Sequence, residues 1–325
     1  MEYLMNMMKK VLIAGVMFML SAGLYAQSID QVGAKYNEGN EAMKAKSYDE
    51  AVKAYESALK LANSVGGEAD ELKGNIETQL ENAYYRNGIS LYKSKKYDAS
   101  VAQFNKSKAL AVKGGDAEMQ DKLTVITAKV LSSKGMSQIN DKDYDGAMAS
   151  FDEAHRVKPT CVISYYGKGI VWKEKGDFTK MMANMDKAIE LGATEPKMDK
   201  YVGKAKSVAS KALVAEATVE ITKEHGKEAV EYINDSFKYT SGDADTYYYL
   251  TIAYNKSKDF GNAAKAANTA LGMKEGDKSD IYFELGQALQ GSGDTGGACD
   301  AYKKVSSGPN VDAAKYQMTQ VLSCG

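Results

Sequence analysis

The sequence predicts an all-α protein, built as an array of about seven helix hairpins, three of them with lengthened arms, and closed by a C-terminal helix. Two observations lead to this prediction. One spacing of small and aromatic residues recurs along the chain, and only three prolines occur in 325 residues. Proline interrupts helices, so its scarcity beside abundant Ala, Lys and Leu favours long helices over a turn-rich β fold.

The composition excludes several classes of function. Lys and Arg number 42 against 43 Asp and Glu, which gives a net charge of -1. Only Arg86 and Arg156 are arginines, and the chain lacks the basic face that nucleic-acid binding needs. With two histidines, three cysteines and no phosphate-loop, paired-cysteine or His-x-x-x-His motif, the sequence predicts no cofactor, no metal site and no catalysis.

The first 26 residues have the pattern of a secretory signal peptide. Lys9 and Lys10 precede an apolar run over residues 11–20, and small residues lead to Ala26. The run is shorter than the ~20 residues of a membrane-spanning helix. We expect cleavage after Ala26 and export of residues 27–325 to the periplasm, or alternatively outside the cell, without stable membrane insertion. An uncleaved anchor or a buried first helix is the alternative.

The recurring spacing is clearest in the copy that begins at Gly135. Tyr144 follows nine residues later, and Ala147, Phe151 and Ala154 come next at helical steps. The other copies begin at Gly39, Gly88, Gly169, Ala217, Thr251 and Gly286. Small residues let two helices approach closely, and the aromatic residues fill the space between them. One hairpin cannot bury its apolar face alone, so the copies must stack.

At these residues, from about Val32 to Val305, the chain resembles the tetratricopeptide repeat family. The resemblance implies a right-handed superhelical solenoid whose first helices line a concave face. It also implies a role as a scaffold for protein–protein interaction, without naming the partner.

The second helices of the copies are unevenly spaced. Their first small residues lie 49, 47, 34, 48, 34 and 35 residues apart, so three steps exceed the usual ~34. The added residues keep a helical period, which predicts long arms that turn at residues 66–67, 114–115 and 192–196. These arms either pack against each other or offer an extra surface to a partner.

The end of the chain predicts a capping helix over about residues 311–323, after a break at residues 307–309. Cys299 and Cys324 lie on consecutive predicted helices. Our hypothesis is that they form a disulfide after export, with Cys161 left as a free, partly buried thiol.

A row of aromatic residues on the first helices is the candidate partner-binding groove. Three residues before the small residue of each first helix there is usually a Tyr or Phe, and other side chains continue the same face. The predicted groove comprises Tyr36, Asn40, Tyr85, Ile89, Tyr92, Tyr166, Ile170, Lys173, Tyr248, Ile252, Asn255 and Phe283. The neighbouring Tyr84, Tyr165, Tyr247 and Tyr282 point about 100° away, toward the core. In the alternative, both rows belong to the core.

A weakly charged aromatic groove suits an extended peptide or a helix with apolar side chains. We therefore expect a non-catalytic scaffold or adaptor of the bacterial cell envelope with a protein or peptide partner. Tetratricopeptide repeats that hold a C-terminal carboxylate use Lys, Arg and Asn in this groove, and only Asn40 matches, which disfavours that ligand. The alternative function is binding of glycans or other small ligands, with tyrosines stacked on sugar rings.

Overall fold

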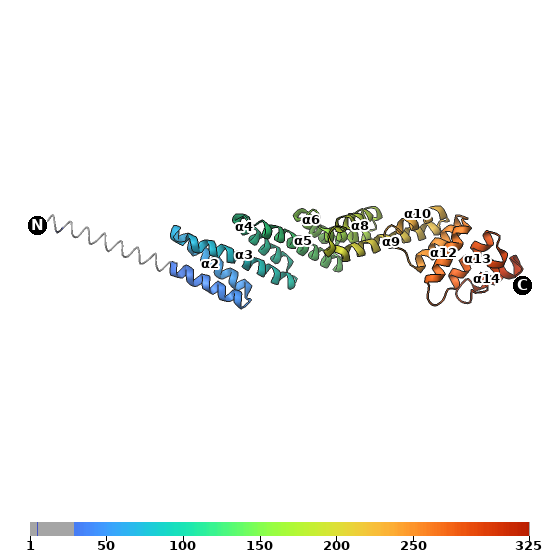
Figure 1. Ribbon diagram of the computed structural model, residues 1–325, viewed down its shortest axis with the longest axis horizontal. Helices are drawn as coiled ribbons and strands as arrows, with labels where there is room; N and C mark the ends of the chain where they lie inside the picture. The colour runs from blue at the N-terminus through green and yellow to red at the C-terminus, as the bar shows by residue number, and fades with distance from the viewer. Residues whose placement is uncertain (1–4, 6–28, 325) are drawn as a thin grey trace. The chain divides into compact units, whose positions relative to one another are not determined.

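The computed structural model describes residue 5 and residues 29–324, and every regular element in this part of the chain is a helix (Figure 1). The predicted signal peptide lies outside the described residues, apart from residue 5. The chain divides into two compact units, Met1–Gly167 and Lys168–Gly325. The prediction of an all-α array is confirmed.

The helices pair into seven successive hairpins. Hairpin 1 joins the helix over residues 29–44 to α2, and hairpins 2 to 7 are α3/α4, α5/α6, α7/α8, α9/α10, α11/α12 and α13/α14. The bounds are α2 (Tyr48–Val65), α3 (Asp70–Lys93), α4 (Tyr97–Gly114), α5 (Ala117–Asn140), α6 (Tyr144–Val157), α7 (Val162–Glu174), α8 (Phe178–Gly192), α9 (Asp199–Thr222), α10 (Gly226–Ser236), α11 (Ala244–Lys256), α12 (Phe260–Met273), α13 (Ser279–Gly291) and α14 (Thr295–Tyr302). Short 3-10 segments, η1 (Gly67–Ala69) and η2 (Pro196–Met198), precede α3 and α9.

Close approach of the two helices within a hairpin explains the recurring spacing. A Cβ atom added at Gly88 would lie 2.5 Å from the ring of Phe104, sixteen residues later. The equivalent distance from Gly39 to Tyr55 is also 2.5 Å. No side chain fits between glycine and ring, so the aromatic residue packs directly on the backbone of the first helix.

The predicted long arms are present and pack against each other. Helices α3, α5 and α9 each have 24 residues. Ile76 on α3 and Leu123 on α5 are fully buried. Lys113 Nζ lies 2.5 Å from Glu77 Oε1, and Lys108 Nζ donates to Thr124 Oγ1 at 2.8 Å. Packing of the arms against each other, one of the two uses predicted for them, is therefore confirmed for α3 to α5.

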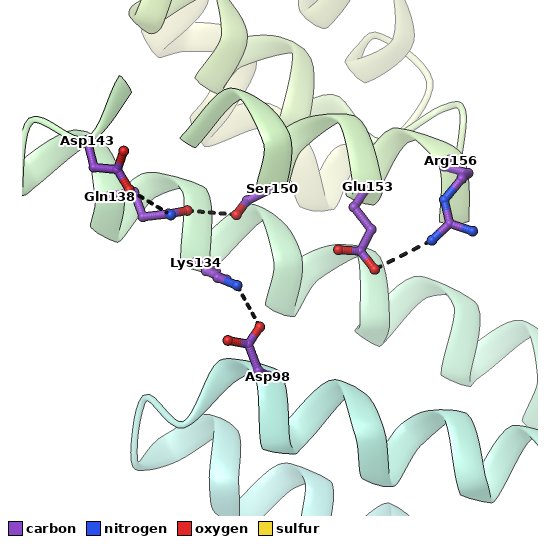
Figure 2. Close-up of polar contacts among 7 residues, drawn as sticks. All are labelled: Asp98, Lys134, Gln138, Asp143, Ser150, Glu153 and Arg156. Carbon is purple, nitrogen blue, oxygen red and sulfur yellow. Dashed lines mark hydrogen bonds and ion pairs between the residues drawn. The ribbon is translucent and has the colours of Figure 1, made fainter. Parts of the chain in front are cut away.

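Polar contacts also link one hairpin to the next. Lys134 on α5 donates to Asp98 Oδ1 on α4 at 2.6 Å, which joins hairpins 2 and 3 (Figure 2). Within hairpin 3, Gln138 accepts from Ser150 Oγ at 2.6 Å and donates to Asp143 Oδ2 at 3.0 Å. Asp143 in turn caps α6 by accepting from the N–H of Gly146.

The C-terminal segment covers hairpin 7 as predicted. Helix α15 (Val311–Tyr316) continues into a π-helical turn, η3 (Gln317–Val321). Ala314 is buried in one cluster with Phe283 and Tyr302. Cys299 and Cys324 form a disulfide with Cα atoms 5.8 Å apart, while Cys161 is a free, buried thiol.

Candidate partner-binding surface

In three hairpins, the aromatic residue that the first helix contributes to the predicted groove packs against an aromatic residue of the second helix. The first-helix ring lies against the second-helix ring of the same hairpin, with centroids 5.8 to 6.1 Å apart and tilted planes. The pairs are Tyr36–Tyr55, Tyr85–Phe104 and Phe283–Tyr302. One face of each first-helix ring is thereby used in packing, so these rings belong to the core as well as to the surface.

The predicted division between groove and core tyrosines holds for only one neighbouring pair. Tyr84 is 7% exposed and Tyr85 is half-buried, as expected. For the next pair the order is reversed, since Tyr166 is 7% exposed and Tyr165 is half-buried. Gly167 brings α7 so close to Phe151 that an added Cβ would lie 2.1 Å from its ring, which explains why the adjacent Tyr166 is covered.

Two further pairs also depart from the prediction. Phe283 is 9% exposed because it packs with Tyr302 beneath the C-terminal segment, while Tyr282 is half-buried. Tyr247 and Tyr248 are both half-buried. The expectation that Tyr166 and Phe283 face an open groove is therefore wrong, whereas Tyr247 and Tyr282 pack against buried clusters, in the direction predicted for them.

In hairpins 1 and 2 two polar groups of the predicted groove are already engaged. Asn40 Oδ1 accepts from the hydroxyl of Tyr55 at 2.7 Å, and the hydroxyl of Tyr92 lies 3.0 Å from Ser133 Oγ. Burial, followed by the nearby Tyr36, raises the pKa of Tyr55 to about 12. Lys122 Nζ lies 4.2 Å from the centroid of Tyr85, a cation–π contact. Ile89 is half-buried beside these rings.

Helix α7 contributes two further residues of the predicted groove, and the charged one, Lys173, is surface-exposed. Lys173 lies 4.0 Å from Glu174 Oε1, and Ile170 is half-buried. A loose exposed ion pair of this kind contributes little to stability or orientation.

Hairpins 6 and 7 bring three of the predicted residues to two cavities. Tyr248 lines a cavity of about 200 Å³ together with Asp245 and Ile281. Ile252 and Asn255, on the same helix, line a cavity of about 370 Å³. Burial, followed by the charges of Glu284 and Asp280, raises the pKa of Tyr248 to about 12, so this tyrosine stays neutral at physiological pH.

Asn255 is the most polar of these three residues and is only partly satisfied. Its Nδ2 donates to the backbone oxygen of Glu284 at 3.0 Å and to Glu284 Oε2 at 2.8 Å. Its Oδ1 is buried and has no hydrogen-bond partner among the described residues. Burial raises the pKa of the Glu284 carboxyl, while the bond from Asn255 opposes that shift.

One family model matches a part of the chain. Residues 36–112 match the family model described as tetratricopeptide repeat. No curated protein matches the chain.

Solved structures similar to this chain share little sequence with it. The crystal structure of MamA protein is 16% identical over 60% of this chain and 95% of its own, with a TM-score of 0.38. YrrB, described as a TPR protein with an unusual peptide-binding site, is 15% identical over 55% of this chain and 84% of its own, with a TM-score of 0.37. A tetratricopeptide repeat protein from Parabacteroides merdae is 12% identical over 91% of this chain and 100% of its own, with a TM-score of 0.31.

Glu284, whose backbone and side-chain oxygens both accept from Asn255, is not among the residues predicted from the sequence. Nothing in the repeat spacing marks this position, which lies two residues before Gly286 on the facing helix α13. Its role depends on which residues of two hairpins come together.

None of the described helices combines the length and the apolar composition that spanning a membrane requires.

Proposed function

We propose that the protein is a non-catalytic scaffold that binds a segment of a partner protein across α11 and α13. The observation that carries this proposal is the line of Tyr248, Ile252 and Asn255 along α11, beside two cavities. An aromatic ring and an aliphatic side chain supply apolar anchors, which dominate the binding energy of most interfaces.

The charges beside this line disfavour one kind of ligand. Tyr248 lies in the electrostatic field of Glu284 and Asp280. Both carboxylates would repel the C-terminal carboxylate of a partner, whereas they would not repel an uncharged internal segment. The site therefore favours an internal segment of the partner over its C-terminal carboxylate.

Alanine substitution tests the proposal directly. Tyr248→Ala and Ile252→Ala are each expected to weaken partner capture about five- to thirtyfold, the equivalent of ~1–2 kcal/mol. Capture is measured by crosslinking in cells followed by mass spectrometry. Tyr316→Ala serves as the control, because Tyr316 is 59% exposed and remote from this line in the sequence. Undiminished capture by folded Tyr248→Ala and Ile252→Ala proteins contradicts the proposal.

A second candidate, binding of glycans, is favoured by a different cavity. It has a volume of about 350 Å³, and its lining includes Ser207, Ser210, Thr240 and Thr246 together with Tyr249. Hydroxyl groups exchange hydrogen bonds with sugars, and an aromatic ring stacks on their apolar faces. Tyrosine fluorescence that responds to a panel of oligosaccharides, with no protein captured, favours this function over the scaffold.

We also propose that the protein is exported to the bacterial cell envelope. The signal-like pattern of residues 1–26 supports export, and so does the Cys299–Cys324 disulfide, since such bonds persist in oxidising compartments. Amino-terminal sequencing of the native protein is expected to begin at Gln27. Thiol counting under denaturing conditions is expected to give one free thiol, from Cys161; three free thiols contradict the proposal.

A further inference from the structure

A polar cavity between hairpins 1 and 2 lacks the side chain that fills the same place one hairpin further along. The cavity has a volume of about 570 Å³. Asp49 and Glu50, from the first turn of α2, line one side, and Asn87 and Ser90 of α3 line the other. Lys96 completes the charged groups of the lining, which has a net charge of -1.

The equivalent place between hairpins 2 and 3 is occupied by a lysine. Lys134 directly precedes Gly135, as Asn87 directly precedes Gly88, and Asp98 is the second residue of α4, as Asp49 is of α2. The ammonium of Lys134 reaches Asp98 at 2.6 Å (Figure 2). Asparagine is too short to make that contact, so no side chain of α3 brings a cation to the start of α2.

Two polar side chains of this cavity lack a close hydrogen bond or ion pair with a described residue. Asn87 is only 5% exposed, yet its carboxamide makes no hydrogen bond with any described residue. Glu50 forms no ion pair with a described residue, whereas Asp49 is neutralised by Lys53 on its own helix at 2.6 Å.

We propose that this cavity binds a primary ammonium group between the Glu50 carboxylate and the Asn87 carboxamide. An ammonium has three donors and no acceptor, so it satisfies both oxygens at once through charge-assisted bonds. The positive end of the α2 dipole opposes a cation here. The same opposition exists at α4, where the Asp98 carboxylate nevertheless holds the ammonium of Lys134.

The ammonium comes from a lysine side chain of a partner protein or from a free alkylamine. The first source rests on the proposed scaffold function, while the second does not. With either source, binding depends on the positive charge of the ligand. A cavity with a purely structural role would show no such dependence.

Nuclear magnetic resonance of the mature chain tests the site with a defined probe. Nα-acetyl-lysine amide is expected to shift the side-chain amide resonances of Asn87 and the backbone resonances of Glu50 and Ser90. Nα-acetyl-norleucine amide has the same chain without the ammonium and is expected to leave them unchanged. Equal shifts with both probes, or no shift with either, overturn the proposal.

Variants of the two proposed ligands sharpen this test. Glu50→Gln is expected to lower the affinity for the lysine probe at least about tenfold, because one charge-assisted bond is lost. Glu118→Gln is the matched control, since Glu118 is also an exposed acid in the first turn of a helix in the same unit. Asn87→Lys is expected to imitate Lys134, to abolish probe binding and to raise the melting temperature. If that variant does not fold, Asn87→Leu replaces it, because Leu250 and Leu285 are buried at the same position of hairpins 6 and 7.

Carbodiimide coupling in cells separates the two sources of the ammonium. A partner lysine yields a crosslinked peptide that contains Glu50, whereas a free amine adds only its own small mass to Glu50. A lysine probe that binds while no partner is captured supports the ammonium site and contradicts the scaffold. A partner captured through α11 and α13, with no response of Asn87 or Glu50 to the lysine probe, supports the scaffold and overturns the ammonium site.

Discussion

Hairpins 2 and 6 fill the same space between their helices in opposite ways. In hairpin 2 the first helix contributes Gly88 and the second contributes the large ring of Phe104. In hairpin 6 the first helix contributes Thr251 and the second contributes Ala267, and both are fully buried. The larger residue of the pair therefore comes from the second helix in hairpin 2 and from the first helix in hairpin 6, and in both hairpins the pair fills the interior.

The difference extends to the neighbouring tyrosines. The hydroxyl of Tyr84 in hairpin 2 donates to Glu56 Oε1 at 2.6 Å, and Lys106 binds the same oxygen at 2.9 Å. The corresponding Tyr247 in hairpin 6 stacks on Phe237 at 5.2 Å, and its hydroxyl has no hydrogen-bond partner among the described residues. One tyrosine is thus fixed by a polar contact and the other by an aromatic one.

The largest expected effect is that of Phe104→Ala, which removes the ring that hairpin 6 does not have. Loss of a fully buried phenylalanine destabilises a protein by about 3–5 kcal/mol through lost burial and the remaining cavity. Chemical denaturation followed by circular dichroism measures the change. Adding Gly88→Thr to this variant imports the arrangement of hairpin 6 and is expected to recover part of the loss. If the double variant is less stable than Phe104→Ala alone, the proposed equivalence of the two hairpin interiors is contradicted.

Gly88→Ala is expected to destabilise the protein by about 1–3 kcal/mol, because the new methyl group would collide with the Phe104 ring. Gly74→Ala on the same helix is the matched control, since nothing lies within 4 Å of a Cβ at Gly74. That control is expected to stabilise the protein by about 0.5–1 kcal/mol through helix propensity. Thermal denaturation of the two variants reports the difference, and effects of the same sign contradict the packing argument.

The sequence predicts this hairpin architecture because the small residue and the large one recur at a fixed separation of sixteen positions. Gly39, Gly88, Gly135 and Gly286 all face the ring that the spacing assigns to them. Exposure of the groove tyrosines does not follow from the same spacing. Tyr166 is covered through the approach of its neighbour Gly167 to Phe151, a contact between consecutive hairpins that no repeat within one hairpin specifies.

Tyr84→Phe is expected to cost about 1.5 kcal/mol at neutral pH, because it removes a hydrogen bond to a charged group. Tyr247→Phe is expected to change stability little, since its hydroxyl lacks a described partner. Burial raises the pKa of Glu56, but the bonds from Tyr84 and Lys106 outweigh burial and hold that pKa below its usual value.

The pH dependence of this contribution follows from the lowered pKa. Glu56 stabilises the fold above its unfolded pKa of about 4.3, and this stability is lost as the pH falls through the lower folded pKa. The difference between wild type and Tyr84→Phe is therefore expected to shrink as the pH is lowered below about 4. Denaturation curves at several pH values test this, and a difference that grows in acid contradicts the role of Glu56.

The smallest expected effect concerns a feature that hairpins 2 and 6 share. Their intrahairpin turns place Lys95 and Lys258 in the left-handed region, with φ of 58° and 59°, where hairpin 4 has Gly176. Residue type therefore does not reveal this conformation in hairpins 2 and 6, although it does in hairpin 4.

A residue with a Cβ is strained in this left-handed conformation by about 1–2 kcal/mol, whereas glycine loses more chain entropy on folding. Lys95→Gly and Lys258→Gly are each expected to stabilise the protein by about 0.5 kcal/mol, and Gly176→Ala is expected to destabilise it by about 1 kcal/mol. Melting temperatures of the three variants test these expectations. The two lysine turns have the same backbone geometry, so both lysine variants should raise the melting temperature. If one raises it and the other lowers it, contacts beyond the turn determine the effect, and not the backbone conformation.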